Sequence, residues 1–113
     1  MNTDTIMFED ALRTIDRQSP RAWVYLPKDR DWSLHSKSAI LESEEVPPEL
    51  EDEPDAGIPE FAKVNNLIQV LPVTVLQDVA ANARAQKPDV TLADLFQAFE
   101  YYYKNDAFID FSR

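Results

Sequence analysis

The stretch that decides the fold class is Ala22-Trp23-Val24-Tyr25-Leu26, an aromatic and β-branched run between Pro20 and Pro27. Composition of this kind, closed off by prolines, is typical of a β-strand. Other candidate strands are Trp32-Ser33-Leu34, Ser38-Ala39-Ile40-Leu41 and Leu67-Ile68-Gln69-Val70-Leu71. Helical segments lie on both sides of these runs. The predicted fold is therefore α+β, a small antiparallel sheet packed with three helices.

The first two predicted helices are recognised by apolar residues at helical spacing. Before the strands, the spacing i, i+3, i+4, i+7 is met by Phe8, Ala11, Leu12 and Ile15, and either Asp4 or Thr5 can serve as the cap. After them, Thr74 and Gln77 have the form of a capping box. The apolar stripe of this second helix is Val75, Leu76, Val79, Ala80 and Ala83, and Pro88 closes the helix.

The third helix has the clearest signal. Thr91 is the predicted N-cap, and Asp94 adds negative charge to the first turn, where the helix dipole favours it. Its apolar face comprises Leu92, Leu95, Phe96, Phe99, Tyr102 and Tyr103. Each residue turns by about 100°, so Tyr101 is predicted to point away from this face and to be exposed. Asn105 suits the left-handed helix end, and the tail Phe108, Ile109 and Phe111 is predicted to fold back on the core.

The chain length and the placement of proline and glycine predict a single domain, residues 1–113, with one long acidic loop. A chain of 113 residues has the usual size of one domain. Residues 42–60 contain four prolines and the only glycine, Gly57, which break this stretch into an extended loop. The loop holds nine acids and no base, and thus nearly all of the net charge of −10.

The charge distribution excludes direct nucleic-acid binding, because phosphate neutralisation requires a basic surface. An acidic loop instead raises the rate of encounter with a basic protein. The alternative is that these acids only keep a small protein in solution. The candidate partner-binding residues are Glu44, Glu45, Glu49, Glu51, Asp52, Glu53 and Asp55 in the loop, together with Tyr101, since tyrosine is enriched at protein interfaces.

The parts of a catalytic or cofactor site are missing from the sequence. The chain has no cysteine and a single histidine, His35, which makes a zinc site implausible. One glycine cannot form a phosphate-binding loop, and the acids of residues 42–60 lack the alternating pattern of an EF-hand. No catalytic residue, metal or cofactor is therefore predicted. No apolar run is long enough to span a bilayer, and the opening residues lack the layout of a signal peptide, so a cytoplasmic location is expected.

Several aromatic motifs resemble those of one family. These are Trp23-Val24-Tyr25-Leu26, the following Trp32-Ser33-Leu34, and the ending Tyr101-Tyr102-Tyr103-Lys104-Asn105-Asp106-Ala107-Phe108-Ile109. Together with the N-terminal helix, they are similar to the small bacterial immunity proteins of contact-dependent growth inhibition systems. The resemblance implies a cytoplasmic inhibitor that binds the toxin domain of a large surface protein. Several toxins of that class are nucleases. Contact residues differ between such proteins, so the resemblance assigns none.

The sequence therefore favours an immunity protein that neutralises a cognate toxin domain with a basic surface by occluding its active cleft. Two alternatives of other kinds remain. An acidic nucleic-acid mimic could inhibit a DNA-binding enzyme, although a mimic should spread its acids over a whole face. A small adaptor protein is the second alternative. The oligomeric state is not indicated.

Overall fold

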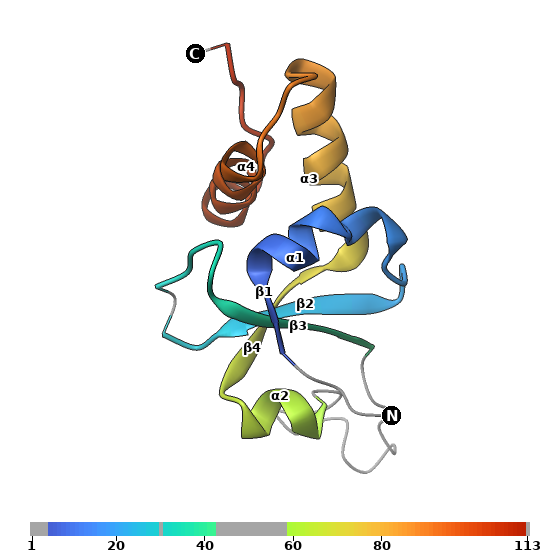
Figure 1. Cartoon of the computed structure of the whole chain (residues 1–113), viewed down its shortest axis with the longest axis vertical. Coiled ribbons are helices and arrows are strands. Elements are labelled where there is room, and N and C mark those ends of the chain that lie inside the picture. The colour runs from blue at the N-terminus through green and yellow to red at the C-terminus, as the bar shows by residue number, and fades with distance from the viewer. Residues whose placement is uncertain (1–4, 30, 43–58, 113) are drawn as a thin grey trace.

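The computed structural model describes residues 5–29, 31–42 and 59–112 and confirms the α+β fold (Figure 1). The strands are β1 (Ile6–Met7), β2 (Ala22–Pro27), β3 (Lys37–Glu42) and β4 (Leu67–Pro72). The helices are α1 (Phe8–Arg13), the 3-10 turn η1 (Ile15–Arg17), α2 (Glu60–Val64), α3 (Val73–Gln86) and α4 (Leu92–Asn105). The predicted helices are α1, α3 and α4, whereas the short α2 and β1 were not predicted.

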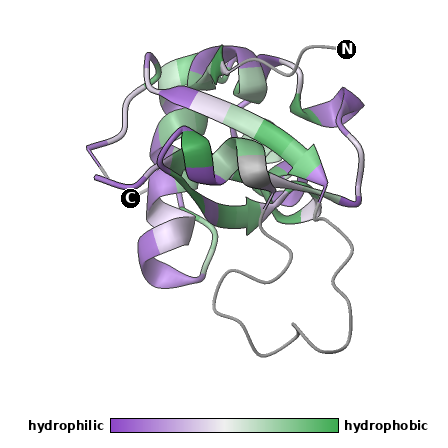
Figure 2. Ribbon diagram, turned by 90° about the horizontal axis from the view of Figure 1, so that it is seen from below, coloured by the Kyte–Doolittle hydropathy of each residue, from purple (hydrophilic) through white to green (hydrophobic). Residues whose placement is uncertain are grey.

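The four strands form one antiparallel sheet in the order β1-β3-β2-β4. Side chains alternate across a strand, and β2 follows this rule. Ala22, Val24 and Leu26 face the main core, while Trp23 and Tyr25 face the opposite side. Figure 1 shows α1, α3 and α4 on the first side and α2 alone on the second. In Figure 2, which views the molecule from the α2 side, much of β3 and β4 is coloured hydrophobic. Hydrophobic side chains therefore pack on both faces of the sheet.

A β-bulge interrupts the alternation between β2 and β4. Val24 pairs with Leu71, but the next residue, Tyr25, pairs with Gln69, so Val70 is the extra residue. As a result, Val70 and Leu71 both pack in the main core although they are consecutive. Before the bulge, Leu67 belongs to the smaller core on the α2 side.

Helix α1 begins later than predicted, at Phe8, and Thr5 is not its N-cap. Its N-cap is Met7, with no side-chain hydrogen bond. Thr5 precedes β1, and Asp4 lies outside the described residues. The reason is strand pairing: Ile6 and Met7 pair with Ser38 and Lys37 of β3 and are therefore extended.

The predicted capping box of the second helix was also wrong. Helix α3 starts at Val73, directly after β4, so Thr74 lies inside its first turn, and no side chain caps the N-terminus. The Gln77 amide is used elsewhere: its Nε2 donates to the carbonyl of Ile15 at 2.9 Å. The apolar stripe is as predicted at Leu76, Val79, Ala80 and Ala83, which are buried, whereas Val75 is half-buried and Val73 is buried in its place.

The capping of α4 is confirmed. Thr91 Oγ1 accepts from the backbone N–H of Asp94 at 3.1 Å, and an Asp94 carboxylate oxygen accepts from the backbone N–H of Thr91 at 3.0 Å. This backbone hydrogen bond from Thr91, followed by the nearby Lys87 ammonium, lowers the pKa of Asp94. The stabilisation from Asp94 is therefore complete above its ordinary pKa and is lost as the pH falls through its lower folded pKa. At the other end, the left-handed residue is Asp106 (φ 53°) rather than Asn105.

Replacing Thr91 with alanine is expected to lower the free energy of unfolding by about 1 kcal/mol, because the α4 cap is lost. The matched control is Thr74→Ala, which removes an exposed threonine that caps nothing and should change it by roughly 0.5 kcal/mol or less. Urea denaturation of both variants measures the difference. Equal losses would show that the Thr91 side chain contributes no cap.

The connection from β2 to β3 is irregular and contains no strand at Trp32-Ser33-Leu34. Its backbone is held by α1 instead, since the N–H groups of Phe8 and Glu9 donate to the carbonyls of Ser36 and Leu34 at 2.8 and 2.9 Å. The Trp32 indole Nε1 donates to the Pro27 carbonyl at 2.8 Å. These hydrogen bonds engage backbone carbonyls that strand pairing would otherwise use. They also place Trp32 next to α4.

The C-terminal tail folds back as predicted, except for one residue. Ile109 and Phe111 pack on the main core, but Phe108 is 45% exposed. The Gln86 side chain fastens the tail to the end of α3: its Nε2 donates to the Ile109 carbonyl at 2.7 Å, and its Oε1 accepts from the Phe111 N–H at 3.0 Å.

Candidate partner-binding surface

The acidic candidates of the sequence lie beyond the part of the chain that the structure describes. These are Glu44, Glu45, Glu49, Glu51, Asp52, Glu53 and Asp55. The two ends of the predicted loop are described, and they are structured: Glu42 closes β3, and Glu60 opens α2. Glu42 is paired with Arg21 at 3.5 Å. The acidic stretch therefore joins the last residue of β3 to the start of α2.

Tyr101 lies on the outer face of α4, as predicted. It is 40% exposed, whereas its neighbours Tyr102 and Tyr103 are half-buried against the main core. The Tyr102 ring lies 5.5 Å from the ring of the exposed Phe108. The last turns of α4 and the tail thus carry two exposed aromatic residues, Tyr101 and Phe108.

A small cavity of about 180 Å³ lies beside the same helix. Its lining residues are Trp32, Glu100, Tyr103 and Lys104. Three of them come from α4, and Trp32 comes from the connection between β2 and β3. We name this feature the α4 cavity.

The aromatic wall of the α4 cavity is held in place from behind. The Trp32 ring meets the Tyr103 ring edge-on at 5.1 Å and 62°, and it lies 5.8 Å from Phe99. Phe99 is fully buried and also contacts the Phe8 ring at 4.9 Å. The hydrogen bond from Trp32 to Pro27 fixes the indole further. The wall is therefore preorganised by the core.

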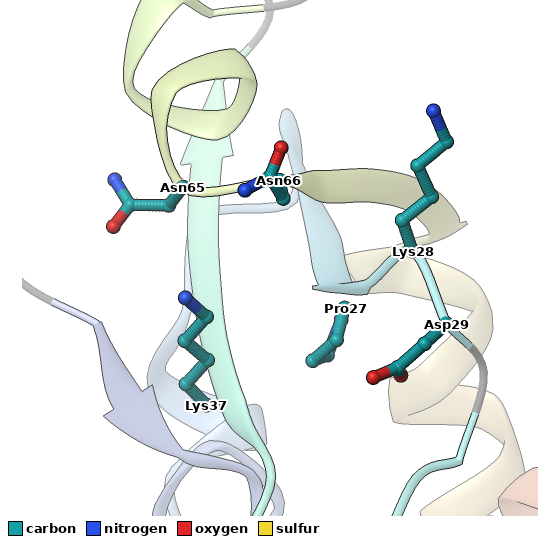
Figure 3. Close-up of a pocket in the computed structure, with 6 residues that line it drawn as sticks. All are labelled: Pro27, Lys28, Asp29, Lys37, Asn65 and Asn66. Carbon is teal, nitrogen blue, oxygen red and sulfur yellow. The ribbon is translucent and has the colours of Figure 1, made fainter.

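A second cavity, of about 370 Å³, lies at the opposite end of β2 from Ala22 (Figure 3). Its lining residues are Pro27, Lys28, Asp29, Lys37, Asn65 and Asn66. In Figure 3 the Lys37 side chain points toward the turn that carries Asn65 and Asn66, whereas Lys28 points away. Within the described residues, neither lysine has an acidic partner within 4 Å.

The polar groups of Asn65 and Asn66 in this second cavity form hydrogen bonds that stabilise the turns around it. Asn66 has a left-handed backbone (φ 57°), a conformation that asparagine tolerates. Its carbonyl accepts from the Lys28 N–H at 3.0 Å, and the Asn65 side chain donates to Phe61. Asp29 brings a carboxylate into the same lining. The cavity therefore mixes both charges, with no aromatic side chain among its lining residues.

The described residues offer no assembled metal site. They contain no group of three or more histidine or acidic residues that could hold a metal ion. His35 is exposed in the turn before β3, where its backbone N–H donates to Ser33 Oγ. The lowered pKa of Asp94 has a structural cause in the α4 cap. Among the described helices, none is long and apolar enough to cross a membrane.

Sequence reasoning missed the α4 cavity. Trp32 was assigned to a strand, and Glu100 was not singled out. The usable signal was the helical position of Glu100, one residue before Tyr101 and three before Tyr103, which places it at the border of the apolar face. The position of Trp32 depends on bonds to α1 and Pro27 that no local pattern reveals.

Comparison with known proteins assigns the chain to a family. The model of a family described as a domain of unknown function, DUF7716, matches residues 5–111. No curated protein and no solved structure matches the chain significantly.

Proposed function

We propose that this chain, which belongs to the DUF7716 family, is a cytoplasmic immunity protein that binds and neutralises a cognate toxin domain. The observation that carries the proposal is the outward face of α4, where Tyr101 is 40% exposed at the end of a helix whose other face is packed in the core. Exposed tyrosine on a rigid element offers a large contact area at low entropic cost. The resemblance of the aromatic motifs to immunity proteins supports the same function.

Charge supports a basic partner. Residues 42–60 carry nine acids and no base, and the whole chain has a net charge of −10. Such a charge speeds association with a positive surface. A nuclease toxin needs a positive surface for its own substrate. An acidic protein that covers this surface would exclude the nucleic acid both sterically and electrostatically.

The proposed mechanism divides the work between two parts of the chain. The acids of residues 42–60 steer the toxin and pair with its lysine and arginine residues. The outward face of α4, which carries Tyr101, supplies the shape-complementary contacts that distinguish one toxin from another. Charge alone would attract any basic nuclease. No step of this mechanism requires a catalytic group on the inhibitor.

Co-expression with the toxin domain encoded beside this chain tests the function. We expect rescue of cell growth and co-purification of a stoichiometric complex. An unrelated nuclease toxin is the control, and it should be neither bound nor neutralised. Rescue from every basic nuclease would favour the nucleic-acid mimic or another charge-driven mode. Failure to bind the neighbouring toxin would rule out the immunity function.

A further inference from the structure

We propose that the α4 cavity binds one cationic side chain, a lysine or an arginine, presented by the partner. The inference rests on the proposed function in one respect, the basic character of that partner. The cavity itself is described entirely by its own residues, and its chemistry can be tested without a toxin.

The size of the α4 cavity suits such a group. Its volume is about 180 Å³. A single water molecule needs roughly 10–15 Å³ of such a volume. The end of a lysine or arginine side chain therefore fits without any rearrangement of the core.

The aromatic lining selects for positive charge. Trp32 and Tyr103 form part of the wall, and tryptophan is the aromatic side chain that binds cations best. The negative face of an aromatic ring attracts an ammonium or guanidinium group and repels a carboxylate. Trp32 is held by the hydrogen bond to Pro27, so no ordering of the indole is needed on binding.

The two charged residues of the lining are not equivalent. Glu100 is half-buried, whereas Lys104, one helical turn further on, is exposed. Glu100 has no basic partner within 4 Å among the residues described. Its carboxylate therefore acts on a bound cation at close range and with less screening than Lys104, whose charge opposes the binding. The balance favours a cation.

The position of the cavity also fits. Glu100 and Lys104 flank Tyr101 on α4, so a partner that contacts Tyr101 lies within reach of the cavity. A basic side chain inserted between Trp32 and α4 would then anchor the partner at the centre of this surface. By contrast, the cavity of Figure 3 has no aromatic side chain among the described residues that line it.

The test uses the full chain and a small probe, Nα-acetylarginine methylamide. Its uncharged counterpart, the citrulline compound of the same shape, is the matched ligand control. The indole N–H signal of Trp32 is followed by NMR during titration, and Trp23→Phe leaves Trp32 as the only tryptophan. We expect a saturable shift with the arginine probe and binding at least about fivefold weaker with the citrulline probe, since a unit charge at about 4 Å contributes about 1 kcal/mol in water.

Variants of the two charged lining residues test whether the cavity prefers a positively charged ligand. Glu100→Gln should weaken binding of the arginine probe about fivefold, and Lys104→Gln should strengthen it. Asp78→Asn, at an exposed acid of α3 outside the cavity lining, is the control and should leave the affinity unchanged.

Three outcomes would overturn the inference: no saturable shift of Trp32, equal binding of the two probes, or a shift by acetate that Lys104→Gln removes. Because no toxin is present, these outcomes do not depend on the proposed function. Conversely, a toxin that fails to bind would leave a positive result at the cavity intact.

Discussion

Replacing Phe99 with alanine is expected to lower the free energy of unfolding by about 4 kcal/mol. The Phe99 side chain is fully buried and contacts the rings of Phe8, Trp32, Phe96 and Tyr103 at centroid distances of 4.9, 5.8, 6.0 and 6.3 Å. It joins α1, α4 and the connection between β2 and β3. Truncation removes all of these contacts and leaves a cavity in a close-packed core, which can relax only in part.

The matched control on the same helix is Tyr101→Ala, which should cost roughly 0.5 kcal/mol or less because the side chain is exposed. Equilibrium denaturation in urea, followed by tryptophan fluorescence, measures both values. A loss for Tyr101→Ala as large as that for Phe99→Ala would contradict the assignment of the helix faces.

The second prediction with a large expected effect concerns the affinity for the toxin rather than the stability of the fold. Tyr101→Ala should weaken the complex with the cognate toxin by about 1–3 kcal/mol, mainly through faster dissociation. The reason is that, in the proposed complex, the exposed tyrosine at the end of α4 becomes buried against the toxin domain and loses that burial when truncated. Calorimetry gives the affinity, and surface-based kinetics gives the dissociation rate.

Val64→Ala is the control for this second prediction. Val64 is 69% exposed on α2, on the other side of the sheet from α4. Its truncation removes exposed apolar surface on a helix other than the one that carries Tyr101, so it should weaken binding much less than Tyr101→Ala. If Tyr101→Ala leaves the affinity unchanged, the residue lies outside the interface. If Val64→Ala weakens binding as much as Tyr101→Ala, the partner contacts the α2 side instead.

The sequence was most informative where local and tertiary preferences agree. In α4 the Thr91 cap, the acidic first turn and the apolar face all predict the same helix, and the structure confirms each of them. β2 is similarly well determined, because its aromatic and β-branched residues suit the buried centre of a sheet.

The wrong predictions concern places where a distant partner decides the local structure. The start of α1 is set by the pairing of Ile6 and Met7 with β3, which no helix pattern reveals. Gln77 was assigned to a cap but bonds to the Ile15 carbonyl, far away in sequence. The same holds for the α4 cavity. It exists only because backbone bonds to α1 bring Trp32 onto a helix that begins sixty residues later in the chain.

The bulge at Val70 has a consequence for insertions and deletions. Removing a residue from a regularly paired strand shifts the remainder by one position and turns its side chains to the wrong face. Removing Val70 alone would restore regular pairing, with Gln69 still opposite Tyr25 and Leu71 still opposite Val24. Pro72 would remain opposite Trp23, so α3 would still start from the same point. The bulge is thus a place in β4 where related chains can lose one residue and keep both cores in register.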